Sequence, residues 1–161
     1  MKRRQFLKAA AAATGSALSL PVFAESEPVI LEVSGQVEAT RTFTLGELRA
    51  LGVTSLKTST AWTDGTPEFE GVLGRDVLDT LGPLSSSHVT ALALNDYRAD
   101  IPLSDFYDYD VLFAWSMDGE MMTRRDKGPL WIVYPRDDVP QLREERYEHR
   151  WVWQLNRLIL P

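Results

Sequence analysis

The residues best suited to chemistry in this sequence are large aromatic side chains, several of which stand next to turns and polar residues. The chain carries more large rings than the core of a small domain needs, so most are expected in the core and one or two in loops. A ring exposed in a loop is suited to stacking on a flat heteroaromatic ligand. The rings in question are Trp62, Tyr97, Trp115, Trp131, Trp151 and Trp153.

A second candidate feature is a Gly-Pro turn in front of an apolar run. Lys127, Gly128 and Pro129 precede residues 130–134, which have the pattern of a buried strand. Such a turn presents backbone groups and a lysine at the open end of a strand, where a ligand can reach them. The alternative interpretation is a plain hairpin connection.

The sequence offers few residues for thiolate or zinc chemistry. The sequence has no cysteine, which excludes thiolate metal sites and cysteine nucleophiles. Its two histidines, His88 and His149, lie far apart in polar contexts, and we expect both on the surface rather than as ligands. A zinc site or a Ser-His-Asp triad is therefore not expected.

A run of aspartates has some likeness to a calcium-binding loop. The run lacks the central glycine and the closing bidentate glutamate of such a loop, so we expect it to form a solvated acidic face instead. Its members are Asp100, Asp105, Asp108 and Asp110.

The first 24 residues have the pattern of an export signal. Basic residues that include Arg3 and Arg4 precede an Ala-rich apolar stretch, residues 9–20, and small residues end at Ala24. The adjacent arginines favour the twin-arginine route, with the general secretory route as the alternative. The apolar stretch is too short to span a bilayer. We therefore expect a periplasmic protein that is not membrane-embedded, with one domain over residues 25–161.

The charge of the exported domain limits its partners. Cleavage after Ala24 removes four basic residues and no acidic ones, which changes the net charge from −6 to −10. Binding of nucleic acid depends on cationic charge, so such a partner is excluded, and an anionic membrane surface is disfavoured. With no cysteine, the domain depends on its core rather than on disulfides.

The pattern along the chain predicts an α+β, mostly β domain with a few short helices. Thr44 and Glu47 form a capping box ahead of leucines at helical spacing up to Leu51, and a second short helix fits residues 73–81. Branched and alternating apolar residues predict the strands. The expected strands span residues 29–37, 53–62, 88–94, 111–115, 120–123, 130–134 and 151–160.

The order and spacing of several short segments resemble the molybdopterin-binding domain of the sulfite oxidase superfamily. The resemblance covers nearly the whole of residues 25–161 and implies a sulfite-oxidase-type fold with mixed sheets. The segments that carry it are residues 69–73, 95–97, 101–103, 112–114 with 118–120, 128–130 and 151–155.

The resemblance departs from the enzymes of that superfamily at their molybdenum ligand. Those enzymes bind molybdenum through a cysteine thiolate on the loop after an early strand, and the matching residues 57–62 offer hydroxyl groups instead. A hydroxyl does not replace a soft thiolate, so molybdenum and a redox activity are not expected. The chain is similar to a branch of small periplasmic pterin-binding proteins that signal to membrane proteins controlling cyclic di-GMP. This implies a pterin ligand and a membrane-bound partner with a periplasmic domain.

The resemblance also implies which side chains contact the pterin. Trp62 and Tyr97 are the candidates for stacking on the ring, and Asn95 and Asp96 for hydrogen bonds to its amino-pyrimidinone edge. The alternative for Asp96 is that it only caps a turn.

Four further residues complete the predicted ligand-binding set. Thr60 takes the place of the metal ligand as a hydrogen-bonding group, and Arg125, Lys127 and Gly128 line the opposite loop. The alternative for Arg125 is a solvated surface position.

Two other functions remain open from the sequence. One is a molybdenum-cofactor-dependent oxidoreductase, or its accessory subunit, that lacks the cysteine ligand. The other is a ligand-free interaction module whose acidic surface binds a membrane sensor.

Overall fold

Two β-sheets, one mixed and one antiparallel, form the framework of the protein. The computed structural model describes residues 27–161, and the predicted export signal, residues 1–24, lies outside them. Sheet A has the strand order β2-β1-β10-β5-β6, in which β1 and β10 are parallel and the other neighbours antiparallel. Its strands are β1 (Val29–Gly35), β2 (Arg41–Thr44), β5 (His88–Ala93), β6 (Arg98–Pro102) and β10 (Leu155–Leu160).

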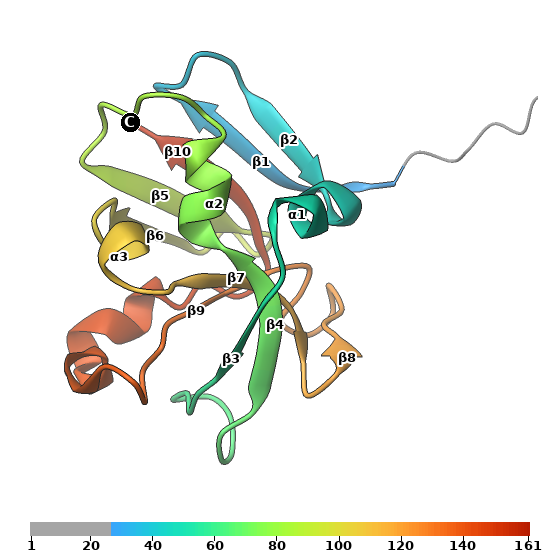
Figure 1. The fold of residues 1–161 in the computed structure, drawn as a ribbon, viewed down its shortest axis with the longest axis vertical. Coiled ribbons are helices and arrows are strands. Elements are labelled where there is room, and N and C mark those ends of the chain that lie inside the picture. Colours follow the sequence, from blue (N-terminus) through green and yellow to red (C-terminus); the bar gives the residue numbers. More distant parts are fainter. Residues whose placement is uncertain (1–26) are drawn as a thin grey trace, which may run out of the picture.

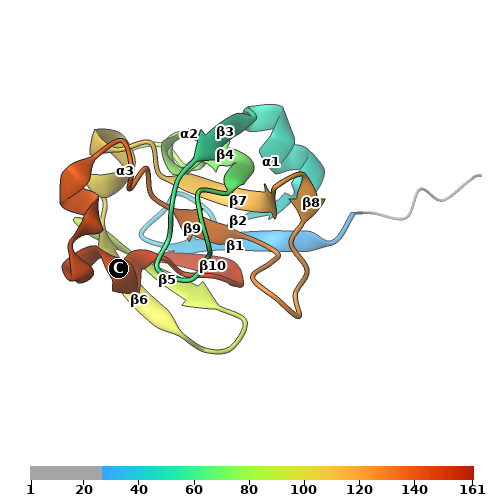
Figure 2. The same cartoon turned by 90° about the horizontal axis from the view of Figure 1, so that it is seen from below.

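Sheet B is antiparallel and lies in a second layer. Its order is β3-β4-β7-β8, and β9 also pairs with β7. In Figure 2 its strands β3, β4 and β7 lie above strands β1, β10 and β5 of sheet A. The strands of sheet B are β3 (Thr54–Lys57), β4 (Glu68–Leu73), β7 (Leu112–Met117), β8 (Glu120–Met121) and β9 (Trp131–Val133).

Short helices connect and flank the sheets. The predicted capping box is confirmed at the first of them, because Glu47 N donates to Thr44 Oγ1 at 3.2 Å and Thr44 N donates to Glu47 Oε2 at 2.8 Å. The two 3₁₀ helices lie near the C-terminal end of the chain, drawn in orange-red in Figure 1, and η2 packs against β6. The helices are α1 (Leu45–Leu51), α2 (Gly74–Asp79), α3 (Asp105–Asp108), η1 (Pro140–Arg143) and η2 (Glu145–Arg150).

The core contains several large aromatic side chains. Trp115 and Trp131 are fully buried, as expected for most of the rings, and Trp115 Nε1 donates to Glu70 Oε1 at 3.0 Å. Strands β4 and β7 approach so closely that a Cβ on Gly71 would overlap the carbonyl oxygen of Phe113. Burial of such large side chains contributes hydrophobic stabilisation to a chain that has no cysteine for a disulfide.

The predicted C-terminal end of strand 53–62 and the predicted N-terminal end of strand 151–160 are wrong. The first ends at Lys57, because the residues after it bond to Asp137 instead of a neighbouring strand. The second begins only at Leu155, because Gln154 has a φ of 52°, which interrupts the extended backbone. Both shortened ends become loops that carry aromatic rings.

Candidate functional site

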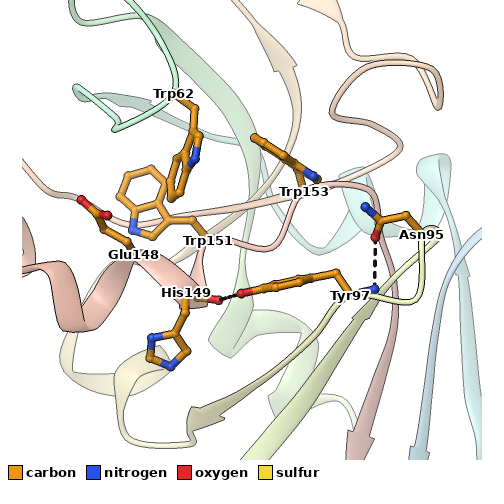
Figure 3. A pocket seen from close by; sticks show the side chains of 7 residues that line it. All are labelled: Trp62, Asn95, Tyr97, Glu148, His149, Trp151 and Trp153. Carbon is orange, nitrogen blue, oxygen red and sulfur yellow. Dashed lines mark hydrogen bonds between the residues drawn. The ribbon is translucent and has the colours of Figure 1, made fainter.

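One pocket on the surface is lined by four large aromatic rings. Its volume is about 280 Å³, and Figure 3 shows its lining residues coming from four separate segments, with the imidazole of His149 turned away from the tryptophan rings. These segments are the loop after β3, the turn between β5 and β6, the helix η2 and the irregular stretch between η2 and β10. The lining residues are Trp62, Asn95, Tyr97, Glu148, His149, Trp151 and Trp153.

Trp62 lies at the centre of a cluster of tryptophans. The centroid of its ring is 5.9 Å from that of Trp151, 5.9 Å from that of Trp153 and 6.4 Å from that of the buried Trp131. The rings meet tilted or edge to face, the arrangement that their quadrupoles favour. Trp62 nevertheless keeps 38% of its surface exposed, so part of its ring is free to contact a ligand.

The loop that carries Trp62 is fixed by the carboxylate of Asp137. Ser59 donates to this carboxylate twice, from its backbone N at 2.6 Å and from Oγ at 2.7 Å, and Asp137 N donates to Thr58 Oγ1 at 3.2 Å. These hydrogen bonds, first of all that from the Ser59 hydroxyl, lower the pKa of Asp137 below its usual value, with Arg143 adding to the effect. The loop is thus held by a charged acceptor.

Thr60 orders the same loop from inside. It is almost completely buried, its Oγ1 accepts from Trp62 N at 3.0 Å, and it is hydrogen-bonded to Thr63 Oγ1 at 2.8 Å. Thr60 does not line the pocket. In this structure it positions the backbone of Trp62.

The turn between β5 and β6 supplies one end of the pocket. Asn95 Oδ1 accepts from Tyr97 N at 3.1 Å, which leaves the amide N–H groups of Asn95 as the part that can contact a ligand. Asp96 occupies the left-handed turn position, with a φ of 66°, and does not line the pocket. Tyr97 Oη donates to the backbone oxygen of His149 at 2.8 Å and so joins this turn to η2.

A buried ionic network holds η2 in place. Arg150 Nη1 lies 2.6 Å from Asp105 Oδ2, and Tyr134 Oη donates to the same oxygen at 2.8 Å. Burial, together with the negative charge of Asp105, raises the pKa of Tyr134 well above its usual value. The prediction that Asp105 belongs to a solvated face is therefore wrong, because two side chains distant in sequence enclose it.

The loop of Arg125, Lys127 and Gly128, predicted to line the site opposite Thr60, does not line the pocket and instead contacts the rings of Trp131 and Trp153. Lys127 Nζ lies 5.8 Å from the centre of the Trp153 ring and 5.7 Å from that of Trp131, and it pairs with Asp126 at 3.2 Å. A Cβ on Gly128 would overlap the carbonyl oxygen of Met122, so glycine is needed there for packing.

The structure brings together three of the eight predicted contact residues. Trp62, Asn95 and Tyr97 all line the pocket. Five others lie outside its lining, and of these Arg125 is exposed to solvent. Those five are Thr60, Asp96, Arg125, Lys127 and Gly128.

Four lining residues were absent from the predicted set. Trp151 and Trp153 were recognised only as rings that could stack, and His149 only as a surface residue, which its exposure confirms. Glu148 had no signal of its own, because it stands in a charged stretch without a clear period.

Within residues 27–161 no group of three or more His, Asp or Glu side chains is placed to hold a metal ion. No helix in the same range has the length and apolar character needed to cross a membrane.

Comparison with known proteins agrees with the fold. The family described as "Oxidoreductase molybdopterin binding domain" matches residues 18–137. The chain belongs to this family. The resemblance to the sulfite oxidase superfamily and the expected mostly β, α+β fold are thereby confirmed.

A solved structure with a similar fold is that of the sulfane dehydrogenase SoxCD from Paracoccus pantotrophus. The two share 21% sequence identity with a TM-score of 0.62, and the match covers 81% of this chain. It covers only 37% of the dehydrogenase chain, so this protein corresponds to about a third of that enzyme. Curated protein sequences give no significant match.

Proposed function

We propose that this member of the molybdopterin-binding domain family is a periplasmic pterin-binding protein without redox catalysis. The observation that carries the proposal is the pocket in which Trp62, Trp151, Trp153 and Tyr97 surround a space of about 280 Å³. Ligand pockets for drug-sized molecules have volumes of roughly 300–1,000 Å³. The volume here suits a single fused ring system, and the aromatic walls suit its flat faces.

The polar groups of the pocket also suit a pterin. A pterin has donors and acceptors along the edge of its ring system, and the pocket lining includes a carboxylate and an amide besides the aromatic rings. These groups come from Glu148 and Asn95. The family's pterin ring therefore fits the side chains that are present.

The absence of redox catalysis is proposed from the donor set of the loop after β3. Where the superfamily's cysteine is expected, the hydroxyl groups of Thr58, Ser59 and Thr60 are all engaged with other protein groups. They are hard donors and are poorly suited to replace a soft thiolate. We therefore do not expect the bound pterin to carry molybdenum in this protein.

A signalling role follows from the resemblance to small pterin-binding proteins. We expect the chain to report pterin binding to a membrane partner that has a periplasmic domain and controls cyclic di-GMP. The pocket suits a sensor because its walls come from four segments that one bound ligand would contact together. A ligand with a higher affinity for one arrangement of these segments shifts the protein toward that arrangement and so changes the surface available to a partner.

A molybdenum-cofactor oxidoreductase, or an accessory subunit of one, is the second candidate. The family description and the fold shared with a sulfane dehydrogenase favour it. In that case the cofactor would hold the metal without a protein thiolate.

One experiment on native material separates the candidates. The chain is purified from the periplasmic fraction of its own cells, its small molecules are released by denaturation, and pterin fluorescence and molybdenum content are measured per chain. The proposal predicts one pterin and no stoichiometric molybdenum. Molybdenum at one atom per chain would favour the oxidoreductase, and a chain without pterin would favour an interaction module. Recovery of the mature chain only from the cytoplasm would contradict its localisation.

A further inference from the structure

Glu148 is a carboxylate at the pocket without a partner of its own. Its side chain is half-buried and makes no hydrogen bond or ion pair with any residue in the described range 27–161. Figure 3 shows it at one end of the pocket, beside Trp151 and Trp62, with Asn95 at the opposite end. A ligand stacked on Trp151 or Trp62 would therefore have this carboxylate at its edge.

The chemistry of this end favours hydrogen-bond donors. An ionised carboxylate only accepts hydrogen bonds, and its two oxygens match a pair of adjacent N–H groups, as they do in arginine pairs. None of the seven lining residues is lysine or arginine, so the lining offers no cation to an anionic ligand group. The pocket thus disfavours a ligand with a carbonyl oxygen or a phosphate near Glu148.

We propose that Glu148 selects for the amino-pyrimidinone edge of the ligand, where N3–H and the 2-amino group are adjacent donors. This inference rests on the proposed pterin-binding function and names the residue that sets its specificity. Glu148 thus makes the hydrogen bonds to this edge that the sequence analysis assigns to Asn95 and Asp96.

The test compares two pteridines that differ at one position. Pterin carries an amino group at C2, whereas lumazine carries an oxygen there, which turns a donor into an acceptor. Both are titrated by tryptophan fluorescence and calorimetry against the purified wild-type chain, Glu148→Gln and Glu145→Gln. Glu145 is an exposed carboxylate on the same helix that does not line the pocket, so it is the matched control.

The expected result is a change of preference rather than a general loss of binding. The wild type and Glu145→Gln should bind pterin more tightly than lumazine by on the order of tenfold, because one charge-assisted hydrogen bond distinguishes the two. Glu148→Gln should lose this preference or reverse it, since a glutamine amide can donate to the lumazine oxygen and accept from its N3–H. Retained lumazine affinity would also show that the variant is folded.

Two other outcomes overturn the proposal in different ways. If the wild type binds both pteridines equally, or Glu148→Gln keeps the wild-type preference, the role of Glu148 is wrong and pterin binding stands. If the wild type binds neither pteridine, the proposed function fails and this inference fails with it.

Discussion

Tyr134 is a phenol enclosed by charged partners, and its titration gives a residue-level prediction. Its pKa is raised in the folded protein, so its contribution to stability is present below the usual tyrosine pKa of about 10 and is lost as the pH rises beyond that value. Tyr134→Phe should lower the free energy of unfolding by about 1 kcal/mol near neutral pH, since it removes the hydrogen bond to Asp105.

The alkaline pH dependence is the more specific readout of Tyr134. Above pH 10 the unfolding free energy of the wild type should fall more steeply than that of Tyr134→Phe, by about 1.4 kcal/mol per pH unit for one proton. Denaturant titrations of both proteins at several alkaline pH values measure the two slopes. Equal slopes would mean that Tyr134 titrates alike in the folded and unfolded chains.

Single residues were predictable from the sequence where their neighbours in the chain decide their position. Trp62, Asn95 and Tyr97 were identified because they stand at expected strand ends. Asp105 was not, because its burial depends on a tyrosine and an arginine, the latter 45 positions later in the chain. Glu148 was missed for a similar reason, since only the packing of η2 turns it toward the pocket.

At the scale of elements, Asp137 is the charged anchor of the loop over residues 58–66. Asp137 accepts two hydrogen bonds from Ser59, and the loop holds Trp62 against the other tryptophans. We expect Asp137→Ala to weaken pterin binding by about tenfold, because hydrogen bonds to a charged group contribute roughly 1.5–3 kcal/mol. The fold should remain, since the anchor lies outside the core. Asp138→Ala is the matched control, because that neighbouring aspartate is exposed.

The anchor also has a defined pH dependence. The pKa of Asp137 is lowered in the folded protein, so its stabilising contribution is present above the usual aspartate value of 3.8 and is lost as the pH falls through the lower folded value. Near pH 4 the wild-type loop should therefore stay ordered, as measured by Trp62 fluorescence or amide hydrogen exchange of the loop. Loop opening already at pH 5 would contradict this account.

The elements themselves were predicted best where local signals and pairing agree. The capping box placed α1 correctly, and the alternation of residues 88–94 and 111–115 gave β5 and β7. Strands β2 and β6 were not predicted, because each is short and has a single large aromatic or branched aliphatic side chain, Phe43 and Ile101 respectively, to mark it before its partner strand is known. The alternation of apolar and polar residues also continues past Lys57, but the strand ends there because Ser59 bonds to the carboxylate of Asp137.

At the scale of the whole molecule, the two sheets form the rigid part and the loops form the site. The resemblance gave the correct superfamily, and two of the segments that carry it, residues 69–73 and 112–114, lie on the paired strands β4 and β7. It gave the pocket only in part, since Trp151 and Trp153 come from the irregular end of the chain and meet Trp62 through packing between distant segments. Export and the membrane partner stay predictions.

The central claim is that a pterin binds against Trp62 and Tyr97, and a titration of purified chains tests it most directly. Wild type, Trp62→Ala and Tyr97→Ala are titrated with pterin by calorimetry, with Tyr107→Ala as a control at an exposed tyrosine outside the pocket. Thermal melts verify that each variant is folded.

The account predicts saturable binding to the wild type and to Tyr107→Ala, each with one site. Both pocket variants should bind about ten- to a hundredfold more weakly, because each loses a stacking contact of about 1 kcal/mol and the buried area of its ring at about 25 cal/mol per Å². Wild-type affinity in folded Trp62→Ala and Tyr97→Ala would place the ligand elsewhere, and a folded wild type that binds no pterin would contradict the function itself.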